Sequence, residues 1–263
     1  MTWVEAVTSV AAGLLISVLT TPVGVSGAVF LLPVQLSVLA VPNPAVTPTN
    51  LLFNIVAGPG ALLRYRRGGA LTGPLTRLLL VGTLPGVVVG AVVRVFLVPG
   101  PDAFRLVVAA ILLPLGLWLC LRAAATRPWP AGPAPSRPRL ISLSALVGVV
   151  GGVYGIGGGS ILGPILVGRG MPVAVVAPAA LASTFVTSVA GAATFSVLSL
   201  TGGGDIAPRW DVGLLCGFGG LIGGYLGAYL QPHLPERALR FGLGALAVAL
   251  ATVYAVQAGV NLG

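Results

Sequence analysis

Charged residues are scarce in this chain: only 7% of its 263 residues are charged, whereas a soluble globular domain carries about 25%. Hydrophobic residues make up 56% of the chain, and the mean hydropathy is +1.04. A chain this apolar needs a bilayer as its solvent, which predicts an integral membrane protein. The apolar segments are continuous runs of Leu, Val, Ala and Gly. They predict an all-α protein and lack the alternating pattern of an outer-membrane barrel.

Residue types that soluble or enzymatic chemistry needs are missing or rare. Lysine is absent, which excludes a P-loop, and the dinucleotide fingerprint GxGxxG does not occur. Cys120 and Cys216 lie far apart in apolar segments. We therefore expect both to be small buried residues that form neither a redox pair nor a metal site. We therefore expect no metal and no cofactor. The basic residues form no run interleaved with aromatics, so no nucleic acid is expected either.

The tetrapeptide GVSG at residues 24–27 is similar to the nucleophile motif of rhomboid-type intramembrane proteases. That chemistry needs a histidine base beside the serine. The single histidine, His233, follows Pro232 at the edge of another span, where a solvated loop residue is expected, whereas Ser26 lies deep in the first span. The sequence therefore predicts that the protein is not an enzyme.

Eight transmembrane helices are predicted from the apolar runs, since about 20 residues cross the hydrocarbon. The first and fifth runs are longer than that and are interrupted by Gly and Pro, so each is expected to be a broken or re-entrant helix. The first is expected to be retained, because it has no basic leader region and no small-residue cleavage site. The predicted spans are residues 4–40, 47–63, 76–98, 103–122, 140–170, 178–200, 211–230 and 236–258.

All 14 basic residues are arginines, and the net charge is +9. Two groups of arginines flank two loops that are separated by two spans, so both loops are expected on one side. The positive-inside rule predicts that this side is cytoplasmic. Both termini are then expected on the cytoplasmic side as well, and the membrane is expected to be the cytoplasmic membrane. The two groups are Arg64, Arg66, Arg67 and Arg77, and Arg122, Arg127, Arg137 and Arg139. The arginines expected near the opposite face are Arg94, Arg105, Arg169, Arg237 and Arg240.

The segment TRPWPAGPAPSRPR at residues 126–139 is rich in proline, which forbids a helix and favours an extended linker. It separates a first four-helix repeat, residues 1–125, from a second, residues 140–263. An even number of spans in each half predicts parallel repeats, related by an axis along the membrane normal. The matching positions are Gly24, Gly27 and Pro33 with Gly155, Gly158 and Pro164; Pro48 with Pro178; Gly82, Gly86 and Gly90 with Gly220, Gly224 and Ala228; and Pro101 and Asp102 with Pro235 and Glu236.

In GGVYGIGGGSILGPIL, residues 151–166, glycines interrupt an apolar run. Backbone N–H groups freed there lack partners in lipid, so the stretch must line a cavity or pack inside protein. Free N–H groups at the start of a half-helix form an anion site, aided by the helix dipole. The alternative is that the glycines only permit close helix crossing. The candidates for anion binding are Gly155, Gly157, Gly158, Gly159 and Ser160 in the second half and Gly24, Ser26 and Gly27 in the first.

Each half also carries one polar stripe. Asn50 and Asn54 are four residues apart and share a helix face, with Gly58 one turn further. Polar residues within a span are costly unless they have a partner or face water, so the stripes are expected to line the pathway. The alternative is hydrogen bonding between helices that only holds the bundle together. The stripe of the second half consists of Ser183, Thr184, Thr187 and Ser188.

Carboxylates lie at the ends of the predicted spans and not in their middles, so the sequence gives no support for a proton relay within the membrane. Asp102 lies near Arg105, and Glu236 near Arg240, at spacings that favour local ion pairs. The alternative is that these two arginines draw anions to the outer mouth.

The stretch GVVGGVYGIGGGSILGPIL, residues 148–166, followed by MPVAVVAPAALAST, resembles the TauE/SafE family of membrane permeases, the sulfite exporters. The two halves and the Pro-Glu start of the last span agree with this resemblance, which covers nearly the whole chain. The first-half copy, GVSGAVFLLP, lacks the triple glycine, and Arg169 replaces an apolar residue. The resemblance implies transport of small anions across the cytoplasmic membrane, with sulfite, sulfonates and related organosulfur anions as substrates.

We therefore expect a secondary transporter whose site lies between the two halves, where the broken spans meet the polar stripes, and which works by rocking of the halves. A passive anion channel and a non-transporting membrane assembly protein are the alternatives. The expected partners are a small anionic solute and the lipid bilayer. The direction of transport, the coupling ion and the oligomeric state stay open, with a homodimer as one option.

Overall fold

The computed structural model describes residues 1–42, 45–69, 71, 73–97, 102–124, 136–200 and 207–262. Every regular element within these residues is helical, which confirms the predicted fold class. Pro101 and most of the predicted linker lie outside the described residues. The helices are α1 (Trp3–Thr20), η1 (Thr21–Val23), α2 (Ala28–Ser37), α3 (Val46–Arg67), α4 (Pro74–Phe96), α5 (Asp102–Ala124), α6 (Arg137–Tyr154), α7 (Gly159–Gly168), α8 (Val173–Leu200), α9 (Trp210–Leu230), η2 (Gln231–His233) and α10 (Glu236–Leu262).

Six helical stretches among the described residues are long and apolar enough to cross a membrane. Large apolar side chains such as Leu19, Val81 and Val197 are exposed on the outer faces of these helices, as a lipid environment favours. The prediction of a multi-span helical membrane protein is confirmed, whereas the number of eight spans stays a prediction. The six stretches are Trp3–Val23, Val46–Arg67, Pro74–Phe96, Val173–Leu200, Trp210–His233 and Glu236–Gln257.

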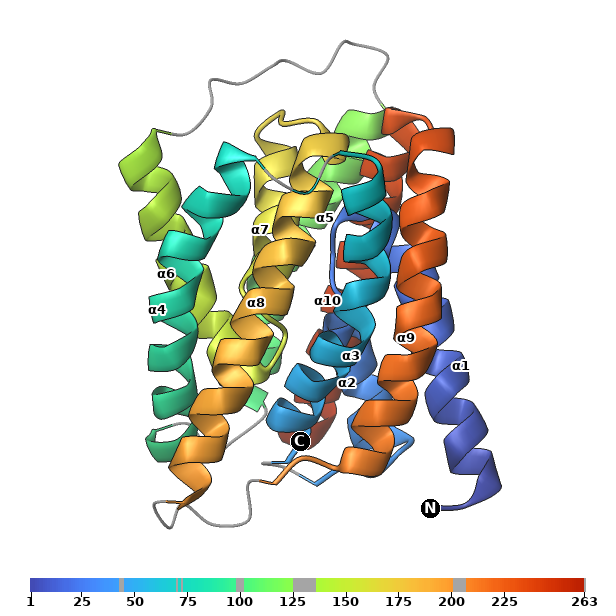
Figure 1. Cartoon of the computed structure of the whole chain (residues 1–263), viewed down its shortest axis with the longest axis vertical. Coiled ribbons are helices and arrows are strands. Elements are labelled where there is room, and N and C mark those ends of the chain that lie inside the picture. The colour runs from blue at the N-terminus through green and yellow to red at the C-terminus, as the bar shows by residue number, and fades with distance from the viewer. Residues whose placement is uncertain are drawn as a thin grey trace.

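The chain reverses direction soon after α1. Gly24 follows η1 with a φ of 78°, a left-handed conformation that glycine adopts without strain. The non-helical residues 24–27 and then α2 lead back toward the end of the bundle where α1 began (Figure 1). In the same way α6 ends at Tyr154, Gly155 turns the chain with a φ of 70°, and α7 returns. Each half therefore begins with a helical hairpin whose second arm is a short helix.

The two halves run in opposite directions, so the predicted parallel repeat is wrong. α3 and α8, the first helices after the two hairpins, are antiparallel, because Leu51 packs beside Gly191 whereas Gly58 packs beside Phe185. α5 and α10 are antiparallel as well, because Gly116 packs beside Val248 whereas Arg237 donates to the carbonyl oxygen of Ala123. The physical reason is the hairpin, because it returns the chain to the side on which it began and leaves three helices, not four spans, to traverse the bundle in each half. An odd number of crossings inverts the second half relative to the first.

The predicted placement of the termini beside the arginine-rich loops is also wrong. Figure 1 shows both chain ends at one end of the bundle, which we call the Trp3 end, whereas α5 ends and α6 begins at the other, which we call the Arg137 end. α3 runs in the same direction as α1, because both pack in parallel on α9, and it reaches the Arg137 end at Arg67. The hairpin again accounts for the difference, because it returns the chain to the side on which it began.

Most arginine positions gather at the Arg137 end. Arg169, Arg237 and Arg240, which were predicted near the opposite face, lie there too, so the charge asymmetry is stronger than the sequence suggested. The described positions at the Arg137 end are Arg64, Arg66, Arg67, Arg77, Arg122, Arg137, Arg139, Arg169, Arg237 and Arg240, and those at the Trp3 end are Arg94, Arg105 and Arg209.

Glycines spaced four apart allow α4 to approach α6 and α9 to approach α1. A Cβ added at Gly86 would collide with the carbonyl oxygen of Ala145, and one added at Gly223 would collide with that of Leu14. The predicted match of the α4 glycines with the series that begins at Gly220 is wrong by one residue. Gly220 faces α3 instead, where an added Cβ would lie 2.7 Å from the Cβ of Ala57. The equivalent series are Gly82, Gly86 and Gly90 on α4 and Gly219, Gly223 and Gly227 on α9.

Candidate functional site

Asn54 of α3 connects the two chain reversals in the centre of the bundle. The Oγ of Ser26 donates a hydrogen bond to Oδ1 of Asn54, and Nδ2 of Asn54 donates to the carbonyl oxygen of Gly155 at 3.3 Å. Ser26 is 5% exposed and Asn54 is 3% exposed. One amide therefore uses its acceptor on the first turn and a donor on the second.

The second turn is also held by α8. The backbone N–H of Gly158 donates to Oγ1 of Thr187 at 3.1 Å, and Oγ of Ser160 lies 3.5 Å from Oγ1 of Thr184. All three of these side chains are buried. The predicted polar stripe of the second half thus faces the predicted glycine turn of the same half.

Ser183 lies on the neighbouring face of α8 and contacts α4 instead. Its Oγ lies 3.0 Å from Oγ1 of Thr83, a buried residue that the sequence reasoning did not select. This contact joins a helix of the first half to a helix of the second. Ser183 therefore takes part in a hydrogen bond between helices, which is the alternative to lining the pathway.

Two half-helices begin at the two turns. α2 starts at Ala28 beside Asn54, and α7 starts at Gly159 beside Thr184. The first N–H groups of a helix have no partner within it and carry the positive end of its dipole. Because α2 leads to the Trp3 end and α7 to the Arg137 end, both positive ends face the centre. Such an arrangement suits an anion.

The glycines of the second turn are tightly packed. A Cβ added at Gly159 would collide with the carbonyl oxygen of Ala180, one at Gly157 would lie 2.5 Å from Cγ2 of Thr184, and one at Gly158 would lie 2.7 Å from Cβ of Thr83. Close packing therefore requires glycine at these positions. Anion binding by their N–H groups stays a prediction.

The first-half candidates divide into two groups. Ser26 and Gly27 lie at the centre, where a Cβ on Gly27 would come 3.1 Å from the ring of Phe53. Gly24 lies further toward the Arg137 end, and a Cβ there would come 2.5 Å from Cα of Ala177 near the start of α8. Gly24 therefore serves the chain reversal and is not brought into the group around Asn54.

A small cavity lies beside Asn54, and its volume is about 30 Å³. This volume holds a water molecule, which needs about 10–15 Å³ on the same measure. A sulfur oxyanion is larger, so it enters only if the surrounding helices move apart. Among the predicted site residues, the lining includes Ser26, Gly27, Asn54 and Thr184.

Asn50 is fully buried, and neither of its amide atoms has a hydrogen-bond partner among the described residues. A Cβ added at Gly155 would lie 3.1 Å from the Cβ of Asn50, so the unpaired amide stands next to the second turn. Ser188 of α8 is likewise buried with an unpaired Oγ. Buried polar groups are almost always paired in native proteins, so an unpaired amide calls for an explanation.

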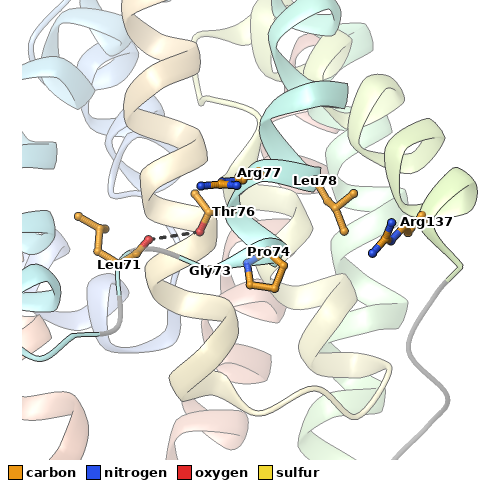
Figure 2. A pocket seen from close by; sticks show the side chains of 7 residues that line it. All are labelled: Leu71, Gly73, Pro74, Thr76, Arg77, Leu78 and Arg137. Atoms are coloured by element: carbon orange, nitrogen blue, oxygen red, sulfur yellow. Dashed lines mark hydrogen bonds between the residues drawn. The ribbon is translucent and has the colours of Figure 1, made fainter.

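The largest cavity described lies away from these residues. It has a volume of about 700 Å³ and is located at the Arg137 end, where α4 and α6 begin. Its lining includes Arg77 and Arg137, but Figure 2 shows that these two side chains do not point toward one another. The cavity therefore forms no two-arginine clamp, and it contains none of the predicted site residues.

The acidic residue at the start of α10 has a local structural role. Glu236 pairs with Arg240 at 2.9 Å, and its Oε1 accepts a hydrogen bond from the backbone N–H of Val173 at 3.0 Å. Arg240 also donates to the carbonyl oxygen of Val167 at 2.8 Å. The predicted ion pair of the second half is confirmed, whereas the side chains of Asp102 and Arg105 lie outside the described part of the chain.

Arg94 is a buried cation near the second turn that the sequence reasoning did not select. It is 6% exposed, and its Nε donates to Oγ1 of Thr47 at 3.3 Å. Thr47 in turn donates to the carbonyl oxygen of Val153, just before the turn. The sequence did contain a signal, because Arg94 follows Gly90 at the same four-residue spacing and therefore shares the glycine face of α4.

A family model described as Sulfite exporter TauE/SafE matches residues 9–254, nearly the whole chain. No curated protein matches. No solved structure matches either.

Proposed function

The chain belongs to the Sulfite exporter TauE/SafE family, a family of membrane transporters and not of enzymes, and from this premise we propose that it moves small sulfur-containing anions, such as sulfite or sulfonates, across the cytoplasmic membrane. The substrate passes between the two halves, at the level where Asn54 connects the two turns. The transport is secondary, driven by solute or ion gradients.

The hydrogen bonds of Asn54 carry this proposal. Asn54 lies beside the positive ends of two half-helices that face each other, in a region where both turns and residues of both polar stripes come close. Half-helix N-termini near the middle of a membrane attract anionic groups of transporter substrates. An anion that broke the hydrogen bond between Ser26 and Asn54 would accept hydrogen bonds from the hydroxyl, the amide and the backbone N–H groups.

Alternating access is the mechanism we propose. The inverted order of the two halves supports it, because a movement that opens one end has an equivalent movement that opens the other. The buried state of the polar stripes and the small volume beside Asn54 also favour a transporter over a channel with a standing pore. The movement would shift the contacts between α4 and α8 and between α3 and α9, which join the two halves.

For the orientation we propose that the Arg137 end faces the cytoplasm. Support comes from the gathering of arginine positions at that end, which the positive-inside rule associates with the cytoplasmic side. The termini then lie on the non-cytoplasmic side.

The test is uptake by the purified protein in liposomes. Radiolabelled sulfite is the probe, and unlabelled sulfite, sulfoacetate, sulfate, taurine and chloride are the competitors. We expect saturable uptake that sulfoacetate reduces and chloride does not. Taurine is the matched control, because it carries a sulfonate whose charge is balanced by an amine. Liposomes without protein give the background.

A binding measurement complements the uptake assay. A ligand that binds only the folded state raises its stability, by about 2.7 kcal/mol at a hundred times the dissociation constant. Saturable stabilisation by sulfite in detergent would agree with a transporter. Uptake that rises linearly with concentration would indicate a channel instead. The absence of both uptake and stabilisation with every anion would favour the assembly protein.

A further inference from the structure

Arg94 and Gln231 occupy equivalent positions in the two inverted halves. Arg94 follows the glycine series of α4 by four residues, and Gln231 follows the glycine series of α9 by four residues. Both side chains are 6% exposed. Because each series packs its helix on the first arm of a hairpin, both side chains reach the place where that arm ends.

Each of the two side chains lies beside the equivalent point of the hairpin on which its helix packs. Nε2 of Gln231 donates to the carbonyl oxygen of Pro22, two residues before Gly24. Arg94 is linked through Thr47 to the carbonyl oxygen of Val153, two residues before Gly155. The two contacts are equivalent in position but differ in charge, since a guanidinium is always protonated and the amide is neutral.

Asn50 adds a second observation at the charged position. It lies three residues after Thr47 on α3, so the two side chains are neighbours on one helix face. Its buried amide has no partner among the described residues, and it adjoins Gly155. The guanidinium of Arg94 and the amide of Asn50 thus stand on the same side of the second turn. A charged residue within a membrane is a functional candidate by default.

We propose that Arg94 and Asn50 bind the oxygens of the transported anion when the α6–α7 turn moves away from Thr47, at the Trp3 end of the pathway. This inference rests on the proposed function. A sulfite or sulfonate group offers oxygens to both the guanidinium and the amide donors, and its charge is balanced by Arg94. The equivalent position at the Arg137 end has a neutral Gln231, so the two ends of the pathway differ in their attraction for anions.

A different role for Arg94 is to stabilise the C-terminus of α6 through the helix dipole. The two roles separate by measurement, because a residue that only stabilises α6 changes stability and leaves affinity unaltered. The test therefore measures both the dissociation constant of sodium sulfite and the melting temperature, in detergent, for the same variants. The variants are Arg94→Gln, Arg94→Lys and Asn50→Ala, with Arg209→Gln as the control.

We expect Arg94→Gln to raise the dissociation constant of sulfite about tenfold or more, since a charged hydrogen bond is lost. Arg94→Lys should retain part of the affinity, because it keeps the charge without the planar fork. Asn50→Ala should weaken binding by about threefold to tenfold. Arg209 lies at the same end and pairs with Asp211 at 2.8 Å, so Arg209→Gln controls for the loss of one positive charge and should leave affinity unchanged.

Unchanged affinity in Arg94→Gln and Asn50→Ala, with sulfite bound by the unaltered protein, overturns this inference and leaves the proposed function standing. An equal loss in Arg209→Gln also overturns it, since the effect is then one of overall charge. If the unaltered protein binds no sulfur anion, both proposals fall. Should Arg94→Gln not fold, Arg94→Lys and Asn50→Ala decide the question.

Discussion

Nδ2 of Asn54 lies 3.3 Å from the carbonyl oxygen of Gly155, and this contact joins two segments 101 residues apart in sequence. Asn54 belongs to the first half and Gly155 to the turn of the second. A movement of one half against the other must stretch or break this bond. The contact therefore couples the relative position of the halves to the group on which we place substrate binding.

The first prediction concerns Asn54→Ala. This change leaves Oγ of Ser26 and the carbonyl oxygen of Gly155 without their partner, which costs about 1–3 kcal/mol of folding stability. Sulfite uptake should fall about tenfold or more if the amide also contacts the anion. Ser196→Ala is the matched control, because Ser196 is an exposed residue whose hydroxyl donates to the carbonyl oxygen of Ala192 on its own helix. Uptake by folded Asn54→Ala at the unaltered rate would contradict the site.

The second prediction compares two glycines that differ in the space around them. A Cβ at Gly159 would collide with Ala180, whereas a Cβ at Gly242 of α10 has no atom within 4 Å. Gly159→Ala should lower the free energy of unfolding by about 1–3 kcal/mol through overpacking. Gly242→Ala should leave it unchanged or raise it by about 0.5–1 kcal/mol, since alanine favours a helix. Melting temperatures in one detergent measure both, and equal shifts would contradict the packing account.

The positions of the turns could be predicted from the sequence, but their direction could not. Glycine clusters interrupt an apolar run only where backbone groups find partners inside protein, and Gly24 and Gly155 stand at such interruptions. A glycine-rich stretch, however, permits the chain either to continue across the membrane or to reverse. The contacts that decide between these, such as Gly155 against Thr47, join residues far apart in the chain.

The polar residues show the same division. Asn54 could be selected because an amide in an apolar run needs a partner, and the structure supplies Ser26 and Gly155. For Arg94 the sequence predicts only a role in topology, because arginines near span ends usually set the orientation of the spans. Its burial depends on where the second hairpin ends. The glycine equivalence was one residue late because α9 carries neighbouring glycines, Gly219 and Gly220, that face different helices.

The third prediction concerns topology. Reporters fused after residue 263 and inserted after Gly69 should lie on opposite sides of the membrane, because α3 carries the chain across after the hairpin returns it (Figure 1). With the Arg137 end in the cytoplasm, alkaline phosphatase fused at the C-terminus should be active, and the same enzyme inserted after Gly69 should be inactive. Equal activity at both positions would contradict the inverted arrangement of the two halves.

The fourth prediction tests whether the halves move against each other. Oγ1 of Thr83 on α4 and Oγ of Ser183 on α8 lie 3.0 Å apart, so cysteines at both positions are close enough for a disulfide. With Cys120 and Cys216 replaced by alanine, oxidation of Thr83→Cys with Ser183→Cys should abolish sulfite uptake, and a reductant should restore it. Rocking changes the contact between α4 and α8, and the disulfide prevents that change.

The single variant Thr83→Cys, treated with the same oxidant, should keep its uptake, because it has no partner cysteine. If the fully cross-linked protein transports sulfite as fast as the same protein after its disulfide is reduced, the contact between α4 and α8 does not change during transport. The movement would then have to occur within the hairpins alone, with α2 and α7 as the parts that shift. The bond from Asn54 to Gly155 would be the next contact to test, since it joins a hairpin turn directly to a helix of the other half.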